Sequence, residues 1–482
     1  MNAIEGLKPA NVWRFFQEIS LIPRESKHEE KIRGYVENKA RELGLRHRTD
    51  EAGNVVVYKP GTDPGSPVIL QAHLDMVCEQ DRGTGHDFGN DPIRLVRDGE
   101  WIRADGTTLG ADNGVGVAAM LAIMEDRTLT HPDLELLFTI DEETGLTGAN
   151  LLDPGLLTGR TLLNLDSEED GVLIIGCAGG RSTDLSLEVK LEPAPLRHTP
   201  VLVKVTGLRG GHSGTDIHRG RGNAVKLLVR FLKRLDPQRY HLASISGGSK
   251  HNVIPREAQA LILVGPNSLP GLNELALFMT RSLVSELSGI DEGVRVKLQA
   301  EPTAPEMVVS RDDTARILDL LHGLPHGAVQ MSAEENGSFV VSSTNLAICG
   351  LDGSRFSILT NQRSAYKSSI DDISEMVASI GRLAGASVVK GDDYPAWKPD
   401  CSSKVLALSK GVYTRLFGEE PEVRVIHAGL ECAVFGEKMP GLDMISLGPT
   451  IEQAHSPSER LRIADVERMW NFLTALLAEL SA

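Results

Sequence analysis

The stretch Leu70-Gln71-Ala72-His73-Leu74-Asp75 is the most informative part of the sequence, because an apolar strand there runs directly into a histidine and a carboxylate. Four further apolar segments lead into the same kinds of side chain, at Asp112, at Glu142-Glu143, at Asp166 and at His455. Near-continuous apolar strands separated by helices are typical of a mostly parallel sheet that is buried on both faces. Polar residues at the carboxyl ends of such strands meet at one edge of the sheet. We therefore expect these five strand ends to bring their polar residues together.

The pattern of strands and helices changes twice along the chain, which predicts two domains. Residues 1–179 and 393–482 alternate apolar strands with helices, as in an α/β fold with helices on both faces of a mostly parallel sheet. Residues 180–392 instead show amphipathic strands and longer helices, the pattern of an α+β layer with one open sheet face. Because His455 belongs with the early carboxylates, we expect the outer segments to form one domain that the middle segment interrupts.

Composition and charge exclude several classes of protein. A chain of 482 residues with 41% hydrophobic and 24% charged residues is typical of a globular protein. The net charge of −16 argues against nucleic acid or an anionic membrane as a partner, since both bind basic surfaces. The five cysteines include no C-x-x-C pair, which predicts reduced thiols and no disulfide framework. We see no signal peptide and no membrane-spanning stretch, so we expect a cytoplasmic protein.

The residue types at the five strand ends predict a metal site. The expected ligands are His73, Asp112, Glu143, Asp166 and His455. Imidazole mixed with carboxylate suits zinc, with cobalt or manganese as alternatives, whereas calcium and magnesium prefer oxygen ligands alone. A catalytic metal needs three protein ligands and an open position. Five ligands therefore serve two divalent cations per chain if Asp112 bridges them, and such a pair can share a nucleophilic water.

Two further carboxylates adjoin these ligands. Asp75 lies two positions after His73, so on a strand it faces the same side and could hold the second ring nitrogen. Glu142 precedes Glu143 and is placed to act as the general base. Each motif by itself is typical of a turn, a helix N-cap or a solvated charge pair. Their joint occurrence in this order is what predicts a catalytic metal site.

The order of these residues resembles the cocatalytic-metal peptidases, a family that includes carboxypeptidase G, peptidase T, peptidase V and carnosinase. Longer motifs extend the resemblance over nearly the whole chain, to the aminoacyl-histidine dipeptidase branch of that family. These motifs occupy residues 71–77, 107–114, 164–169, 176–180, 426–432 and 448–457. The resemblance implies that the interrupted domain is catalytic and that the inserted domain is a lid.

The resemblance also implies a role for each candidate residue. His73 and Asp166 would bind one metal, Glu143 and His455 the other, and Asp112 both. Asp75 would orient His73, and Glu142 would be the base. In the lid, His212 within the glycine-rich segment 207–214 would stabilise the oxyanion. Asn252 and Arg363 of the lid would hold the substrate, since a guanidinium pairs well with a free carboxylate. Gly429 would contribute a backbone donor from the catalytic side.

Together these features predict a cytoplasmic metallodipeptidase that hydrolyses dipeptides with a free amino terminus, including aminoacyl-histidine dipeptides. Its partner would be a small peptide substrate. The alternatives are an amidohydrolase that acts on N-acyl amino acids and a non-catalytic peptide-binding protein. Family members with carboxypeptidase or acylase activity tend to have glutamate where this chain has Asp166, which disfavours the amidohydrolase. The sequence leaves open the native metal, whether the chain forms a homodimer, and whether His212 serves its own site or a neighbour's.

Overall fold

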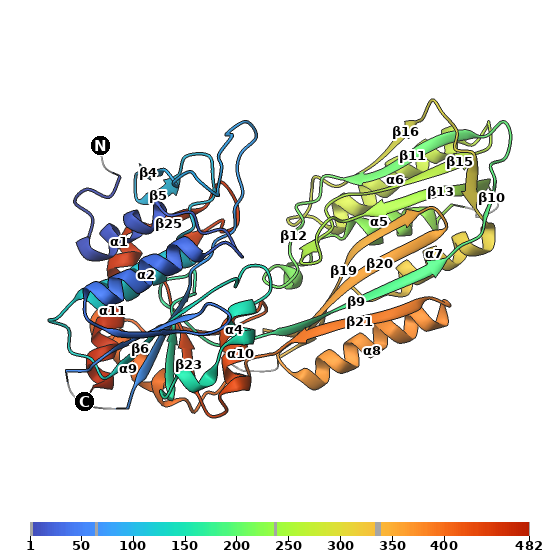
Figure 1. The fold of residues 1–482 in the computed structure, drawn as a ribbon. Coiled ribbons are helices and arrows are strands. Elements are labelled where there is room, and N and C mark those ends of the chain that lie inside the picture. The colour runs from blue at the N-terminus through green and yellow to red at the C-terminus, as the bar shows by residue number, and fades with distance from the viewer. Residues whose placement is uncertain (1–2, 63–65, 236–238, 333–338, 482) are drawn as a thin grey trace. The chain divides into compact units, whose positions relative to one another are not determined.

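The computed structural model describes residues 3–62, 66–235, 239–332 and 339–481. The chain divides into two compact units, which Figure 1 shows. The first contains Met1–Gly176, Trp397–Val425 and Leu430–Ala482, and the second contains Cys177–Ala396 and Ile426–Gly429. The sequence predicted the division at 179/180 and 392/393. It had no signal for the four residues Ile426–Gly429, which join the second unit because they lie against its strands.

The main sheet of the first unit carries the candidate site. Its strand order is β1-β2-β6-β3-β7-β23-β8-β22. The neighbours β6, β3, β7 and β23 run parallel to one another, and antiparallel pairs flank them on either side. The strands are β1 (Arg46–Thr49), β2 (Val55–Lys59), β3 (Val68–His73), β6 (Leu134–Thr139), β7 (Thr161–Asn164), β8 (Val172–Cys177), β22 (Glu422–Ile426) and β23 (Asp443–Ser446).

Every residue of β3, β6 and β8 is buried, as expected for strands that are covered on both faces. Helix α3 lies against β3, α2 against β1 and β2, and α9 against β23. The helices of this unit are α1 (Ala10–Ser20), α2 (Glu30–Glu42), α3 (Ala111–Glu125), α4 (Thr147–Leu151), α9 (Lys404–Phe417), α10 (Glu431–Lys438) and α11 (Ile463–Leu480), with a 3-10 turn at Pro154–Leu156. The predicted α/β class is confirmed, with the parallel strands at the centre of the sheet.

A smaller sheet in the first unit has the order β24-β25-β5-β4. Its strands are β4 (Leu95–Asp98), β5 (Trp101–Ala104), β24 (Ile451–Glu452) and β25 (Arg460–Arg462). The segment between β24 and β25 carries His455, so this sheet fixes both ends of the loop that holds a candidate ligand.

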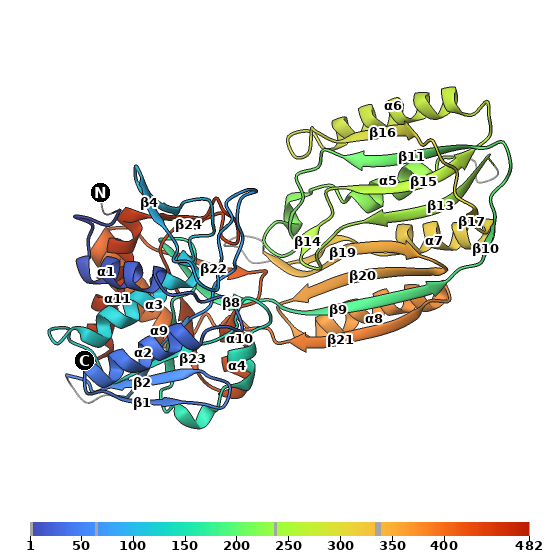
Figure 2. The same cartoon turned by 45° about the horizontal axis from the view of Figure 1, so that its top comes forward.

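The second unit is built on one antiparallel sheet with the order β16-β11-β15-β13-β19-β20-β9-β21. Figure 2 shows these strands side by side. Buried and more exposed residues alternate along β11, so one face is covered and the other is open, as predicted. The strands are β9 (Gly179–Glu188), β11 (Thr199–Thr206), β13 (Tyr240–Gly247), β15 (Ala258–Val264), β16 (Arg295–Ala300), β18 (Gly327–Met331, paired with β19), β19 (Val340–Asp352), β20 (Arg355–Ser364) and β21 (Ser387–Tyr394).

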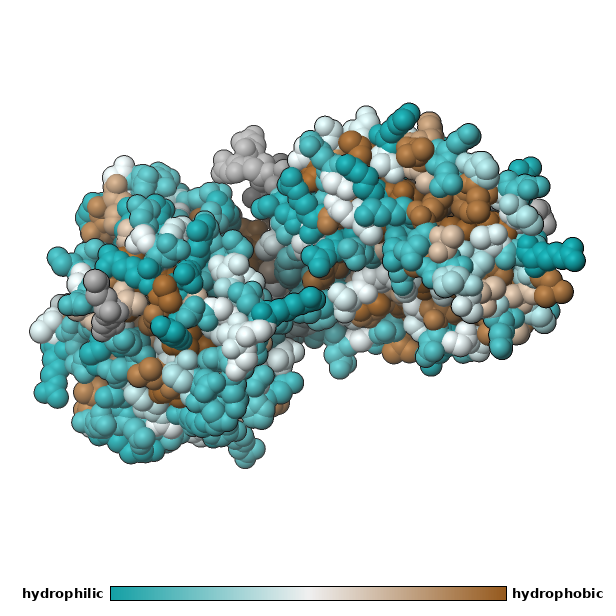
Figure 3. Space-filling model, turned by 90° about the horizontal axis from the view of Figure 1, so that it is seen from above, coloured by the Kyte–Doolittle hydropathy of each residue, from teal (hydrophilic) through white to brown (hydrophobic). Residues whose placement is uncertain are grey.

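Helices cover one face of the sheet of the second unit, and two short strand pairs lie outside the sheet. The helices are α5 (Ala224–Leu232), α6 (Leu269–Glu286), α7 (Arg311–Gly323) and α8 (Lys367–Leu383), with a 3-10 turn at Ile217–Arg219. The short strands are β12 (Gly211–His212), β14 (Val253–Ile254), β10 (Leu191–Pro193) and β17 (Met307–Val309). Hydrophilic residues cover most of the face of each unit that Figure 3 shows. Among the described residues, no helix combines the length and apolar character that a membrane span requires.

Candidate metal centre

Three of the five predicted ligands follow parallel strands, as expected. His73 is the last residue of β3, Glu143 follows β6, and Asp166 follows β7. The expectation of a strand end was wrong for the other two. Asp112 lies in the irregular first turn of α3, and His455 lies in the loop after β24. A short apolar run before a polar residue also occurs at the start of a buried helix, so the local pattern could not separate the two cases.

The first group of donors contains His73, Asp112 and Asp166. Nε2 of His73 lies 3.1 Å from Oδ1 of Asp112 and 3.3 Å from Oδ1 of Asp166. One ligand atom from each residue lies within 4.8 Å of the others. One imidazole nitrogen and two carboxylate oxygens thus face a common point.

The second group of donors contains Asp112, Glu143 and His455. Nε2 of His455 lies 3.0 Å from Oδ2 of Asp112 and 3.0 Å from Oε2 of Glu143. These three residues also offer ligand atoms within 4.8 Å of one another. Asp112 therefore turns one oxygen toward each group, which is the position that a bridging ligand requires.

The electrostatics of these groups fit bound cations. Burial and the charge of Asp112 raise the pKa of Glu143 to about 7. Burial also raises the pKa of Asp166 to about 6. Oε1 of Glu143 is buried and accepts no hydrogen bond from a described residue. Like charges crowded away from water are unfavourable unless a cation offsets them. The donor set and the unpartnered oxygen therefore suit a pair of divalent cations.

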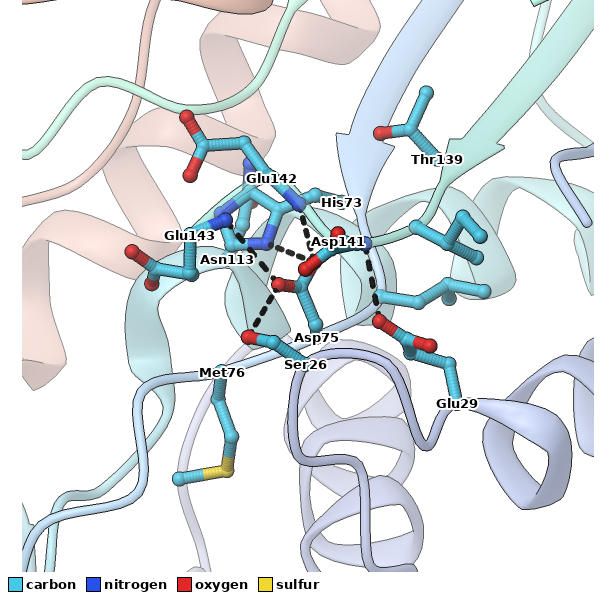
Figure 4. A network of polar contacts seen from close by, with 12 residues as sticks. Ser26, Glu29, His73, Asp75, Met76, Asn113, Thr139, Asp141, Glu142 and Glu143 are labelled. Carbon is cyan, nitrogen blue, oxygen red and sulfur yellow. Dashed lines mark hydrogen bonds and ion pairs between the residues drawn. The ribbon is translucent and has the colours of Figure 1, made fainter. Parts of the chain in front are cut away.

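Asp75 connects both groups through hydrogen bonds to the turn after β6, as Figure 4 shows. Oδ1 of Asp75 lies 3.3 Å from Nδ1 of His73 and accepts the backbone N–H of Glu142 at 3.1 Å. Oδ2 accepts the backbone N–H of Glu143 at 3.2 Å and the hydroxyl of Ser26 at 2.8 Å. The sequence predicted the contact with His73. It had no signal for Ser26 or for the two backbone amides.

A second buried carboxylate, Glu29, holds the residue at which this turn begins. Its Oε1 accepts the backbone N–H of Asp141 at 3.0 Å (Figure 4). Asp141 has a φ of +48°, a left-handed conformation that is unfavourable for a residue with a side chain. Its carboxylate in turn accepts the hydroxyls of Thr144, at 2.6 Å, and Thr147, at 2.5 Å. These contacts stabilise the sharp turn that presents Glu142 and Glu143, and the sequence analysis missed Glu29.

Glu459 holds the loop that carries Asp112. Its Oε2 accepts the backbone N–H groups of Leu109 and Gly110 at 2.8 and 2.9 Å. Its Oε1 accepts those of Ala111 and Asp112 at 2.8 and 3.3 Å. These amides belong to the first turn of α3 and the residues before it, where a helix leaves its N–H groups unpaired and favours negative charge. Four successive backbone positions are thereby fixed around Asp112.

Arg24 holds the other side of the same loop. Its guanidinium donates to the carbonyl oxygens of Leu74, at 3.1 Å, and Asp75, at 3.0 Å, and also to that of Gly110. Arg24 is buried, as is Glu459. The sequence analysis missed both residues, although Glu459 follows His455 by only four positions and is thus close to a quoted motif.

The structure places the other predicted residues in the second unit. His212 and Asn252 lie together, because Gly211 and His212 pair with Ile254 and Val253, and the carbonyl of Asn252 accepts the N–H of Ser213 at 2.8 Å. Nδ1 of His212 accepts the backbone N–H groups of Gly214 and Thr215 at 3.3 and 3.2 Å. An imidazole that accepts at Nδ1 carries its proton on Nε2, so His212 can donate from that atom.

Arg363 lies on β20. Gly429 was expected on the catalytic side, but it belongs to the short segment that joins the second unit, because it packs against Tyr394 of that unit. Arg363 is 5% exposed, and its Nε has no hydrogen-bond partner among the described residues. Gly429 lies against the ring of Tyr394, to which Arg363 also turns its guanidinium at 5.9 Å from the ring centre.

Comparisons with known proteins bear on the whole chain. Residues 69–479 match the model of peptidase family M20/M25/M40. The chain is 40% identical over 491 residues to the cytosol non-specific dipeptidase of Escherichia coli, and the match covers 100% of both proteins. The crystal structure of aminoacylhistidine dipeptidase from Vibrio alginolyticus is 40% identical, with a TM-score of 0.83 over 99% of this chain and 98% of that one. A tripeptidase from Staphylococcus aureus is 16% identical with a TM-score of 0.57, which shows a shared fold.

We predict that Glu459→Gln destabilises the protein and weakens metal binding. An amide offers one acceptor oxygen where the carboxylate offers two, so about half of the four N–H groups lose their partner. Leaving buried donors unpaired costs about 2–4 kcal/mol of unfolding free energy. Urea unfolding of the metal-free protein measures this loss. In Glu452→Gln, which removes only an exposed pair with Arg460, the free energy should change by less than about 1 kcal/mol. Equal changes in the two variants would contradict the role of Glu459.

We also predict that metal binding releases protons and tightens as the pH rises. Burial opposes protonation of His455, but its hydrogen bonds to Asp112 and Glu143 outweigh burial and raise its pKa to about 12. A metal binds the unprotonated ring, so this proton must leave. With the pKa of Glu143 at about 7 and of Asp166 at about 6, protons on these groups also compete with the metal below neutral pH.

Calorimetric titration of the metal-free protein with zinc, in buffers of different ionisation enthalpy, counts the released protons. Repeating it across neutral pH gives the slope of affinity against pH. We expect net release of at least one proton and an affinity that increases with pH. Proton uptake, or an affinity independent of pH, would show that these residues do not bind the metal.

Proposed function

The chain belongs to peptidase family M20/M25/M40, and from that membership and the geometry of its site we propose that it is a dinuclear metallodipeptidase. We propose that it cleaves dipeptides with a free amino terminus, among them aminoacyl-histidine dipeptides, and that it works in the cytoplasm. The observation that carries this proposal is the division of five side chains into two donor groups that share Asp112. Both full-length relatives described above are dipeptidases by name, which favours a dipeptidase over an acylase.

The proposed metal ligands follow from these two groups. His73, Asp112 and Asp166 would hold one cation, and Asp112, Glu143 and His455 would hold the other. Imidazole with carboxylate favours zinc, with cobalt and manganese as alternatives. When bound, a pair of cations supplies an acidified water and polarises the carbonyl of the scissile bond.

Glu142 would act as the general base and acid. Burial and the charge of Glu143 raise its pKa well above the usual value, which a base for neutral pH requires. It makes no contact that would tie its carboxylate to the scaffold among the described residues, whereas its backbone N–H is fixed by Asp75. Its side chain would take a proton from the attacking water and pass it to the amine of the leaving residue. Asp75 would keep both this backbone and the ring of His73 in place.

The second unit would supply the groups that hold the substrate. His212 would donate from Nε2 to the oxyanion, because backbone N–H groups occupy its Nδ1. Arg363 would pair with the carboxylate of the substrate, since it is a buried cation whose Nε has no described partner. Asn252, beside His212, and the backbone of Gly429 would complete the contacts. A lid function for this unit is part of the same proposal.

The experiment that tests this function uses metal-free protein reconstituted with zinc, cobalt or manganese. A panel of dipeptides, their N-acetylated forms and longer peptides is assayed with each metal. We expect cleavage of free dipeptides, including alanyl-histidine, and little cleavage of the acetylated forms. Preferential release of amino acid from the acetylated peptides would establish the acylase alternative instead. Tight binding of dipeptides without cleavage under any metal would establish the binding-protein alternative.

We predict that Glu142→Ala keeps both metals but loses activity by about 10²- to 10⁴-fold in kcat, as expected for loss of a general base. Elemental analysis measures the metal content, and initial rates on alanyl-histidine measure the loss. Glu51→Ala is the matched control, because Glu51 is an exposed glutamate of the same unit, and its activity should equal that of the unaltered protein. Activity of Glu142→Ala within a few-fold of normal would remove Glu142 from this role.

A further inference from the structure

One row of residues crosses four neighbouring strands in the sheet of the second unit. Ser343 on β19 pairs with Arg363 on β20, Arg363 pairs with Gly180 on β9, and Gly180 pairs with Tyr394 on β21. Residues that face each other across adjacent strands project from the same side of a sheet. Arg363 therefore has Ser343 on one side. On its other side lies Gly180, which has no side chain, and beyond it Tyr394.

The polar groups of this row are buried and have open hydrogen-bonding positions. Nε of Arg363 and the hydroxyl of Tyr394 are buried and have no hydrogen-bond partner among the described residues. No ion pair joins Arg363 to a described carboxylate, although it is only 5% exposed. A buried guanidinium without an anion is costly, and so is an unpartnered hydroxyl. Two neighbouring donors that lack acceptors point to a ligand that brings acceptors.

Glycines make room for the ring of Tyr394. A Cβ at Gly180 would lie 2.3 Å from the hydroxyl oxygen of Tyr394, and a Cβ at Gly179 would lie 2.6 Å from its carbonyl oxygen. A Cβ at Gly429 would lie 3.3 Å from the ring itself. The glycines at the end of the motif at residues 176–180 are thus explained by the close approach of Tyr394. This packing sets the position of the hydroxyl relative to Arg363.

His427 lies on the opposite side of Arg363. Its Nε2 is 2.7 Å from the hydroxyl of Ser343, and the residue is 7% exposed. Burial and the charge of Arg363 lower the pKa of His427 to about 3, so the ring is neutral at neutral pH. Its Nδ1 is buried and makes no hydrogen bond that satisfies normal geometry with a described residue. Among Ser343, Arg363, Tyr394 and His427, only Arg363 is then positively charged. A single positive charge matches a ligand with one carboxylate.

We infer that these residues form a subsite for the C-terminal residue of the dipeptide, in which Tyr394 is a second anchor for the carboxylate beside Arg363. The hydroxyl of Tyr394 donates one hydrogen bond, and the guanidinium fork donates two more. The neutral imidazole of His427 lines the space for the side chain of the substrate's C-terminal residue. The ligand class is an L-amino acid residue with a free α-carboxylate. This inference rests on the proposed dipeptidase function and adds Tyr394 and His427 to it.

The test is the substitution Tyr394→Phe, which removes only the hydroxyl. Steady-state kinetics use alanyl-histidine and its C-terminal amide with zinc-loaded protein. For the free acid we expect KM to rise by about 10-fold or more, as for a lost hydrogen bond to a charged group, with kcat within about twofold. For the amide, KM should stay within about twofold. The control is Tyr240→Phe, at a buried tyrosine of the same unit outside this row, and it should leave kcat and KM unchanged for both substrates.

Two more variants test the subsite without relying on Tyr394→Phe alone. Gly180→Ala displaces the Tyr394 ring by its added Cβ, so it should raise KM for the free acid as Tyr394→Phe does. His427→Ala should change the ratio of kcat/KM for alanyl-histidine to that for alanyl-leucine by more than about threefold. Thermal unfolding confirms that each variant is folded, and calorimetric binding of alanyl-histidine to the Glu142→Ala protein gives a readout without turnover.

The outcomes separate the two proposals. If the unaltered protein cleaves no dipeptide with any metal, the proposed function fails. The subsite still stands in that case if dipeptide binding weakens in Tyr394→Phe combined with Glu142→Ala. If the unaltered protein cleaves dipeptides but Tyr394→Phe leaves KM unchanged, or raises it equally for acid and amide, the subsite is wrong. An unchanged side-chain preference in His427→Ala would remove His427 from it.

Discussion

The candidate site of the first unit requires three carboxylates and two imidazoles within a few ångströms of one another, and all of these side chains except His455 are at most 12% exposed. These side chains cannot hold themselves there, because burial and mutual repulsion oppose the ionised form of Glu143 and Asp166. Other groups fix the backbone from which they project. Asp75 binds the turn that carries Glu143, and Glu459 binds the loop that carries Asp112.

Both of these supports act through backbone amides. A carboxylate that accepts several N–H groups fixes several φ and ψ angles at once, and the amides satisfy its buried charge. Arg24 completes the arrangement on the opposite side by donating to carbonyl oxygens. The fully buried parallel strands β3 and β6 set the spacing between His73, at the end of β3, and the turn that follows β6, because neighbouring strands keep a constant separation. These contacts fix the backbone on both sides of the candidate site and so restrict where the donor side chains can lie.

The second unit uses a different device, a row of residues across an antiparallel sheet. Its polar side chains share one face, and a glycine in the row lets the tyrosine come close to the arginine. The same unit presents His212 from a short strand pair that contains Gly211. Gly211 has a φ of +143°, a conformation that residues with a side chain rarely adopt, and a Cβ there would lie 2.6 Å from the carboxylate of Asp216. In both places the glycine-rich motifs reflect close approach between backbone and side chains.

From the sequence alone, the α/β class and the residue types and order of the five candidate ligands could be predicted, because strand burial and metal coordination both restrict which residues can occupy a position. It also pointed to Asp75, since a period of two residues places it on the same side of a strand as His73. The groups that hold those residues in place were visible only in the folded chain. Glu459 binds amides that lie 347 to 350 positions earlier in the chain, and any residue other than proline could supply such an N–H. A contact with a backbone amide does not restrict the residue type that supplies the amide. The sequence therefore did not predict the hydrogen bonds of Glu459 around Asp112, the role of Glu29, or the row that contains Arg363 and Tyr394.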